Sequence, residues 1–469
     1  MLSFAMTTTF PTPSTQKVRR DALGGKRADG HRRTRPIRRP DPHRLRLGAP
    51  DPSLTGVAGL VPFGAFLADE GIDRALHDAF HSLKDARSVV YPMAAQLRLL
   101  MDAFAAGEAR VFGLEALAAD PLFVRLAGGV VPSLDTVYRD LARFDDGAVA
   151  ALEGLMAAQG LRPLGRRLLA EVFLDVDTTV EPLFGTQEGA RPGSNPRYHA
   201  RPSYHPVLAR VAETDTCVGA LLRPGDTAFG EADVPVVERW VERLRRAVGP
   251  ACVIHVRVDA AGDCAALLAK LDRLGCWATV KARMTRDLCD AIATLPAGRW
   301  RSVDWGADGR VERQVAEVDF VRQSWAEAGV AVRVVAVRSR ERDNGKRVYL
   351  WNDLDFTVQA FLTNDAFSDA DEVARRYDAR AGIEPLIGEW KAAWGLGKVP
   401  SRGFDANHAT LLLKLLVHNL LRRYVLRAAP TLQRWRAPWL RRALLAVPGR
   451  LVRSGRRWTL RLAPRPMLN

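Results

Sequence analysis

Four side chains near residue 380 combine an aromatic ring, two cations and a carboxylate at regular spacing. They are Tyr377, Arg380, Glu384 and Lys391, within the segment YDARAGIEPLIGEWK. In a helix, residues seven apart return to nearly the same face, so three of the four would form one stripe, with Arg380 beside it. Such a face suits a site that holds a phosphodiester and a metal ion together. The alternative is an exposed helix with Arg380 and Glu384 as an i,i+4 ion pair.

Pro385 directly follows Glu384 and complicates this helix. Proline lacks the backbone N–H and restricts the residue before it. A kink or a restart at this position would move Tyr377 and Arg380 off the face that carries Glu384 and Lys391.

Three more carboxylates stand near the ends of predicted strands. The apolar run LLAEVFLDVDTTV predicts a buried strand with Asp175 and Asp177 on one face, and the strand CVIHVRV ends at Asp259. Buried carboxylates need a partner or a metal. Together with Glu384, Asp177 and Asp259 are candidates for binding Mg²⁺ or Mn²⁺. Two such ions, about 3.5–4 Å apart, can assist displacement at a phosphodiester.

Each carboxylate has an alternative in the sequence, and one nearby histidine is also a candidate. Asp175 could replace Asp177, Asp263 could replace Asp259, and Glu389 could replace Glu384, although Glu389 breaks the spacing. His205 is a candidate DNA-binding residue, or else a packed histidine.

The composition favours a polyanionic partner. The chain has 469 residues, a formal net charge of +16 and 47% hydrophobic residues. A balance this basic favours nucleic acid, although abundant arginine and alanine are also typical of GC-rich genomes. The five cysteines show no CxxC spacing, which argues against a zinc site or a disulfide framework and fits a reducing cytoplasm.

The elements that position these residues fall into six predicted segments. Apolar spacing predicts helices at Ala58–Phe80, Val90–Phe104 and Leu114–Leu126, followed by a helix that Ser133 caps, as in a DNA-binding helix-turn-helix. The predicted organisation is a disordered basic arm at 1–52, a helical DNA-binding domain at 53–165, an α/β core at 166–298, a β-rich insertion at 299–363, core helices at 364–428 and a basic tail at 429–469.

Strands and helices are predicted within the later segments as well. Strands are expected at Trp300–Trp305, Val311–Val318, Val330–Arg338, Val348–Trp351 and Phe356–Thr363. Asp369–Lys391 is expected to be one helix. Phe404–Leu426 is a strongly apolar helix with two polar exceptions, Asn407 and Asn419.

The sequence resembles the DDE insertion-sequence transposases whose third acidic residue lies in a Tyr-x2-Arg-x3-Glu-x6-Lys signature. Tyr377, Arg380, Glu384 and Lys391 match all four positions. Further matching motifs are Leu174-Asp-Val-Asp-Thr-Thr, Gly185-Thr-Gln-Glu-Gly-Ala with Asn195-Pro, Tyr204-His-Pro, Arg223-Pro-Gly, Arg257-Val-Asp259, Thr363-Asn364 and Asn419-Leu420. The resemblance spans roughly residues 170 to 425, and it is weaker from 54 to 165.

The resemblance implies an RNase H-like core with a β-rich insertion, preceded by an all-helical domain. It implies that Asp177, Asp259 and Glu384 hold two Mg²⁺ ions, and that the other three signature residues grip phosphates. The implied reaction is nicking followed by strand transfer from terminal inverted repeats, in a homodimer. Trp300, Trp305 and Trp351 are candidates for stacking on a flipped base, or else for core packing.

One loop departs from the family pattern, which usually reads Asp-Ser-Gly-Phe. Here Asp259 is followed by Ala-Ala-Gly and Asp263. Two rivals therefore stay open: a decayed DNA-binding protein or repressor of transposition, and a nuclease without strand transfer. The expected location is the bacterial cytoplasm, at the nucleoid.

Overall fold

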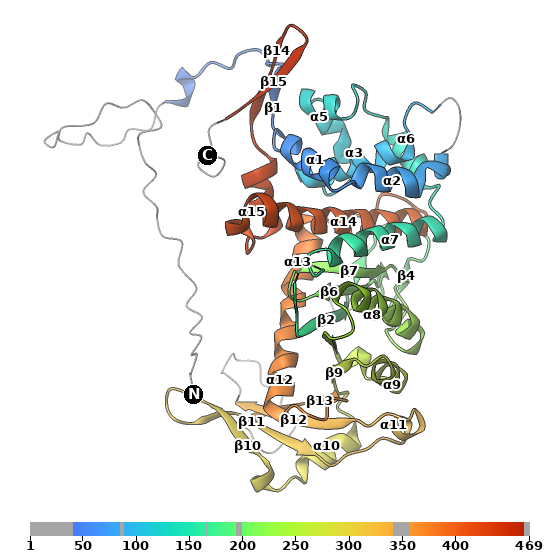
Figure 1. Cartoon of the computed structure of the whole chain (residues 1–469), viewed down its shortest axis with the longest axis vertical. Coiled ribbons are helices and arrows are strands. Elements are labelled where there is room, and N and C mark those ends of the chain that lie inside the picture. The colour runs from blue at the N-terminus through green and yellow to red at the C-terminus, as the bar shows by residue number, and fades with distance from the viewer. Residues whose placement is uncertain (1–40, 85–88, 166, 194–198, 341–355, 464–469) are drawn as a thin grey trace, which may run out of the picture. The chain divides into compact units, whose positions relative to one another are not determined.

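A computed structural model describes residues 41–84, 89–165, 167–193, 199–340 and 356–463. The chain divides into two compact units, residues 1–51 and 52–469. In the first unit, the described part contains the short 3-10 helix η2 (Pro42–Arg44), which the side chain of Asp41 caps. The second unit contains all the other elements (Figure 1). Among the helices of the described residues, none has the length and apolar composition that crossing a bilayer requires.

The second unit begins with helices. They are α1 (Leu60–Asp69), α2 (Ile72–Phe80), α3 (Met93–Ala106), α4 (Leu114–Leu117), α5 (Pro121–Leu126), α6 (Leu134–Leu141) and α7 (Asp146–Leu161). The predicted cap is confirmed, because the hydroxyl of Ser133 accepts a hydrogen bond from the backbone N–H of Thr136 at the start of α6. Apolar side chains of these helices share one core with α13 (Ile383–Ala393) and α14 (Phe404–Ala428).

A nine-stranded mixed sheet forms the centre of the second unit. In sheet order its strands are β10 (Arg301–Trp305), β11 (Val311–Val318), β12 (Arg333–Arg340), β13 (Phe356–Thr363), β9 (Trp277–Lys281), β8 (Val253–Val258), β2 (Glu171–Thr178), β6 (Val207–Val211) and β7 (Thr216–Leu221). Strands β2, β8 and β9 are parallel to one another, and the other neighbours are antiparallel. The predicted β-rich stretch therefore continues the central sheet through β13 and β9. The strand expected at 348–351 lies outside the described residues.

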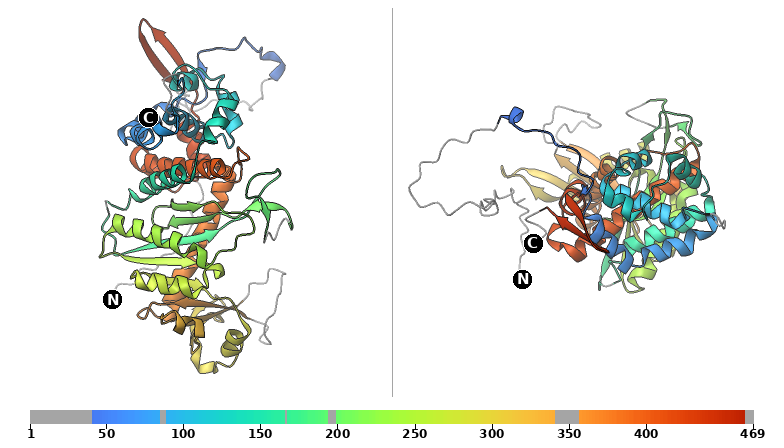
Figure 2. Two further views of the ribbon diagram at one scale, coloured as in Figure 1. Left: turned by 90° about the vertical axis from the view of Figure 1, so that its right-hand side faces the viewer. Right: turned by 90° about the horizontal axis from the view of Figure 1, so that it is seen from above.

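Helices cover both faces of this sheet. Helices α8 (Val234–Val248), α9 (Ala265–Arg273) and α10 (Arg286–Ala293) pack with β2, β8 and β9 in one apolar core. Helix α12 (Ala370–Asp378) packs on the opposite face, against β11, β12 and β13. The two sides are visible in Figures 1 and 2. Shorter elements are the sheet of β3 (Glu181–Pro182), β5 (Pro202–Tyr204) and β4 (Arg191–Pro192), and the helix α11 (Gln323–Glu327).

The expectation of one helix over Asp369–Lys391 is wrong. Helix α12 ends at Asp378, a 3-10 turn η8 (Ala379–Gly382) follows, and α13 begins at Ile383. Pro385 explains the restart, because it cannot donate the hydrogen bond that a continuous helix requires from residue 385 to Ala381. In α13 it is the third residue, where a backbone N–H has no partner within the helix.

The predicted basic tail contains regular structure. After α14 come the 3-10 turn η9 (Pro430–Leu432), the helix α15 (Ala437–Leu440) and the π-helical turn η10 (Arg441–Leu445). The strands β14 (Gly449–Ser454) and β15 (Arg457–Leu462) then form an antiparallel hairpin, which adds to β1 (Leu54–Thr55). Residues from the two ends of the second unit therefore share one small sheet.

Candidate active site

Two of the predicted carboxylates lie at the same edge of the central sheet. Strands β2 and β8 are parallel, and their register pairs Val176 with Val258. Asp177 and Asp259 each follow the paired valine by one residue, so both stand where the carboxyl ends of adjacent strands meet. Asp259 also accepts a hydrogen bond from the N–H of Ala261, 3.0 Å away, and so caps the turn after β8.

Asp177 is largely buried and has a cationic partner. Its carboxylate accepts a hydrogen bond from the N–H of Thr178 at 2.9 Å and lies 3.0 Å from a guanidinium nitrogen of Arg380. Burial raises the pKa of Asp177, the charge of Arg380 opposes this, and the negative charge of Asp259 adds to it. Two carboxylates and one guanidinium therefore share this edge of the sheet.

Tyr377 links the third carboxylate to this group. Its ring packs on Phe361 of β13, with 4.5 Å between ring centroids. Burial raises the pKa of Tyr377 to about 12; the charge of Arg380 opposes this, while those of Asp259, Asp177 and Glu384 add to it. All three carboxylates thus lie near one phenol. Glu384 itself is exposed, at the second position of α13.

The signature cations hold the chain on either side of Asp177. Arg380 donates a hydrogen bond to the carbonyl of Val176 at 3.1 Å, and Lys391 donates one to the carbonyl of Val180 at 2.8 Å. Lys391 also lies 3.3 Å from the carboxylate of Glu181. The restart at α13 separates Arg380 from the helix of Lys391, yet the two side chains bond the backbone just before and just after Asp177.

The alternative carboxylates have other structural partners. Asp175 is fully buried between Arg257, at 2.6 Å, and Arg210, at 3.0 Å. Asp263 accepts the backbone N–H of Arg283 and pairs with Arg322. Glu389 accepts the backbone N–H of Ala437 at 3.0 Å. These contacts tie strands, loops and the C-terminal helices together, so each carboxylate has a structural use.

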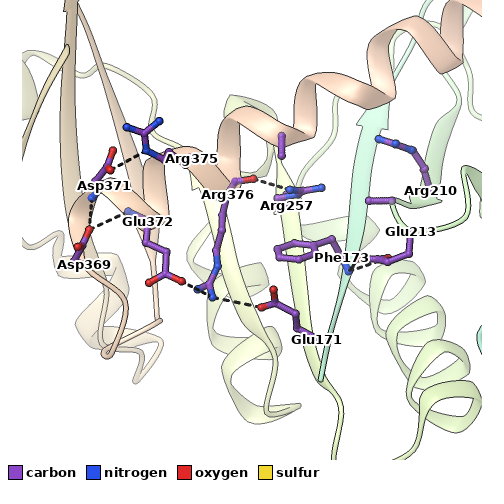
Figure 3. A pocket seen from close by; sticks show the side chains of 12 residues that line it. Glu171, Phe173, Arg210, Glu213, Arg257, Asp369, Asp371, Glu372, Arg375 and Arg376 are labelled. Atoms are coloured by element: carbon purple, nitrogen blue, oxygen red, sulfur yellow. Dashed lines mark hydrogen bonds and ion pairs between the residues drawn. The ribbon is translucent and has the colours of Figure 1, made fainter. Parts of the chain in front are cut away.

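A cavity of about 640 Å³ lies behind this site, between α12 and the sheet (Figure 3). Figure 3 shows Arg376 reaching from α12 to Glu171, at 3.4 Å, and to Glu372, at 2.8 Å. Arg257 donates to the backbone carbonyl of Arg376 at 2.6 Å. Because these charges are paired with one another, the network holds α12 against the sheet and so positions Tyr377 at its end.

The donor chemistry of the three carboxylates fits a divalent cation, because Mg²⁺ and Mn²⁺ prefer hard oxygen ligands. Among the described residues, however, no three His, Cys, Asp or Glu side chains stand close enough together to hold one. In this arrangement Arg380 supplies the positive charge beside Asp177. The residue types therefore fit the ion, whereas a complete set of ligands is not assembled.

The other predicted contacts are divided between surface and core. Trp305 is 59% exposed. Trp300 packs against the core between the sheet and helices α8, α9 and α10, and the guanidinium of Arg338 lies 4.3 Å from its ring centroid. Trp351 lies outside the described residues. His205 bonds the carbonyl of Thr227 through Nδ1 at 2.8 Å, and burial lowers its pKa. His205 is thus a packed histidine here.

Several motif residues have contacts that build the scaffold. The hydroxyl of Tyr204 donates to the carbonyl of Glu188 at 2.7 Å and accepts from Asn407 at 3.1 Å. This pair ties the loop after β3 to α14. Arg223 pairs with Asp233 at 2.7 Å in the buried start of α8.

Sequence reasoning missed Glu181 and Lys414. Glu181 is buried beside Lys391, and burial raises its pKa despite the nearby lysines. Lys414 is fully buried in α14, where it donates to the carbonyls of Gly395 and Lys398. A charged residue in an apolar segment was the available signal: Lys414 is the one lysine within Leu411–Leu421.

The chain was compared with protein families, curated proteins and solved structures. A family described as "Transposase DDE domain group 1" matches residues 44–466. No curated protein matches the sequence significantly. A cryo-EM structure of a piggyBac transposase synaptic complex with hairpin DNA is similar at a TM-score of 0.43, with 12% identity, over 82% of this chain and 79% of that chain.

Proposed function

Because the chain belongs to the transposase DDE domain family, we propose that it cuts and joins the DNA ends of an insertion sequence. The observation that carries this proposal is the meeting of Asp177 and Asp259 at one sheet edge, with the charge of Glu384 nearby. Water would attack the phosphodiester at the element's end and break its P–O3′ bond, which frees a 3′-hydroxyl and leaves a 5′-phosphate. The freed 3′-hydroxyl would then attack a second phosphodiester, so that a new P–O bond forms while the 3′-oxygen of the attacked strand leaves.

We propose that the catalytic core is RNase H-like. The support is the strand order β7-β6-β2-β8-β9, in which the strands of Asp177 and Asp259 are parallel neighbours. In this proposal β10 to β13 are the β-rich insertion, and the helices before residue 165 bind the terminal repeats. A homodimer would hold the two DNA ends.

Asp177, Asp259 and Glu384 are the proposed ligands of two Mg²⁺ ions, for which Mn²⁺ could substitute. When bound, such ions activate the attacking oxygen and stabilise the leaving oxygen. The family membership and the oxygen donors support this assignment. The exposure of Glu384 at the start of a helix leaves its carboxylate accessible for it.

Arg380, Lys391 and Tyr377 are the proposed phosphate contacts. Two of them are cations that already bond the backbone on either side of Asp177, at the carbonyls of Val176 and Val180. Arginine presents donors that match two phosphate oxygens at once, and lysine offers a point charge. Burial raises the pKa of Tyr377 to about 12, so its hydroxyl remains a donor at neutral pH.

The Arg380–Asp177 pair also suits the rival function, a protein that binds the ends without cutting them. In that case Arg380 would serve as the lasting partner of Asp177. Cleavage distinguishes the two functions.

The test incubates purified protein and Mg²⁺ with a labelled duplex of the element's own terminus. Wild type should cut one strand at a defined position, and Asp259→Asn and Glu384→Gln should bind the duplex but not cut it. Glu389→Gln is the matched control: it keeps an oxygen to accept from Ala437 and should still cut. Specific binding without cleavage by wild type, in Mg²⁺ or Mn²⁺, would exclude the catalytic proposal. Cleavage by Asp259→Asn would refute the ligand assignment.

A further inference from the structure

The C-terminal part of the chain is strongly basic. Residues 406–469 contain 13 arginines and one lysine but no aspartate or glutamate. Their formal charge of +14 compares with +16 for the whole chain. Five of these arginines lie within residues 449–462, which we call the C-terminal ribbon: Arg450, Arg453, Arg456, Arg457 and Arg461. All five are exposed.

The ribbon has one packed face and one open face. Leu451 and Leu460 pair across the strands and join a small core with Leu122 and Val447. Side chains alternate along a strand, so Arg450 and Arg461, which are also paired, point away from that core. Arg457, opposite Ser454, is on the same open face.

Arg457 and Arg461 are both exposed on the edge strand β15, on its open face. A polyanion that lies along this face would be attracted to both guanidinium groups. Charge on an edge strand can also serve only to prevent aggregation, and the experiment below separates the two roles.

The packed face is also basic near the turn. Arg125 of α5 lies over the ring of Trp458, 4.3 Å from the centroid, and Arg453 lies 5.6 Å from the same centroid. Trp458 is 43% exposed. The ribbon therefore presents arginines on both faces and lies next to helix α5. Figures 1 and 2 show it reaching past the helices.

We propose that the C-terminal ribbon binds the phosphate backbone of duplex DNA through Arg457 and Arg461. The proposal rests on the proposed function, which supplies the duplex. Six residues of β14 span about 20 Å, and a two-stranded ribbon of this kind fits the major groove of B-form DNA. The contact is with phosphates, so it adds affinity for any sequence and makes binding depend on salt.

The test measures how the affinity of full-length protein for a labelled duplex depends on KCl, between about 50 and 200 mM. EDTA is present, so that no strand is cut. The variant is Arg457→Ser with Arg461→Ser. The control is Arg246→Ser with Arg286→Ser, which removes the same charge from exposed positions on α8 and α10. Thermal unfolding should be similar for all proteins, because these side chains are exposed.

The ribbon variant should bind more weakly, with a salt slope shallower by about 0.9 for each lost phosphate contact, or about 1.8 for two. The control should keep the wild-type slope. Arg457→Lys with Arg461→Lys should restore the slope, because lysine also binds phosphate.

An unchanged slope in the ribbon variant would overturn the ribbon proposal, and intact end cleavage would leave the proposed function standing. The opposite result is that the ribbon variant has a shallower salt slope but the wild type never cuts DNA. That result would support the ribbon proposal and overturn the catalytic proposal. Loss of binding to anionic phospholipid vesicles, with no change in the DNA slope, would assign the ribbon to a membrane surface instead.

Discussion

At the scale of single residues, burial and charge act against each other beside Asp177. Its carboxylate is mostly out of water, and the neighbouring carboxylate of Asp259 adds repulsion. The positive charge of Arg380, which is only 4% exposed, opposes both the effect of burial and the repulsion from Asp259. The same guanidinium is proposed to grip DNA, so one side chain connects the stability of the site with its function.

Replacement of Arg380 should therefore destabilise the fold as well as the DNA complex. Arg380→Gln leaves Asp177 without its cation, and breaking a buried pair in this way costs about 3–5 kcal/mol. Adding Asp177→Asn removes the uncompensated charge and should recover most of that loss. Urea unfolding measures both. The control Arg286→Gln breaks an exposed pair with Asp290 and should change the free energy of unfolding by less than about 0.5 kcal/mol. A double variant no more stable than Arg380→Gln would contradict this account.

At the scale of elements, local patterns predicted most strands but not every connection. Val311–Val318 and Phe356–Thr363 were predicted with the observed bounds, because β-branched and aromatic residues, which favour strands, are frequent in both. The break before α13 depends on Pro385 and on the anchoring of Arg380 to β2; the proline is visible in the sequence, but the anchor joins residues about 200 positions apart. The ribbon was missed because its arginines obscure the alternation of Leu451, Leu460 and their neighbours.

Asn419 shows how one predicted polar exception joins three elements. Its amide accepts from the N–H of Cys217 at 2.9 Å and donates to the carbonyls of Cys217 and Met156. It thereby ties α14 to β7 and α7 in the interior. Asn419→Leu removes all three bonds and takes away the acceptor of the buried N–H of Cys217; an unpaired buried donor costs about 1–3 kcal/mol.

The free energy of unfolding of Asn419→Leu should fall by about 1–3 kcal/mol, as measured by urea titration. Gln323→Ala is the comparison, since it removes an exposed amide that bonds Glu327 on α11; its effect should stay within about 0.5 kcal/mol. Equal effects of the two substitutions would show that the interior amide does not join these elements as inferred.

At the scale of the whole molecule, the N-terminal helices and the C-terminal helices form one core. Hydrophobic periodicity predicted both sets of helices. It did not predict that they pack together, since the apolar face of one helix can pack against many other helices. For the same reason the sequence placed Asp177 and Asp259 at strand ends, yet could not show that Arg380 is the cation that pairs with Asp177. Lys414 lies where the two sets of helices pack together: its ammonium is 5.4 Å from the ring centroid of Phe104 and donates to two carbonyls after α13.

Lys414 should make stability depend on pH. Burial lowers its pKa from 10.5 to about 7, and the charge of Glu181 only partly offsets this. Between these two values the unfolded chain binds a proton that the folded protein does not, so protonation favours unfolding. The contribution of Lys414 to stability is therefore complete above pH 10.5 and is lost as the pH falls toward 7, by at most about 1.4 kcal/mol per pH unit.

The measurement compares the free energy of unfolding of wild type and Lys414→Met at several pH values from 7 to 10. Relative to Lys414→Met, wild type should become steadily more stable as the pH rises. Taking the difference removes the opposite trend from Cys217, whose pKa burial raises to about 12. A constant difference across this range would mean that Lys414 keeps its proton in the folded protein, with its charge accommodated by the two carbonyls and Glu181.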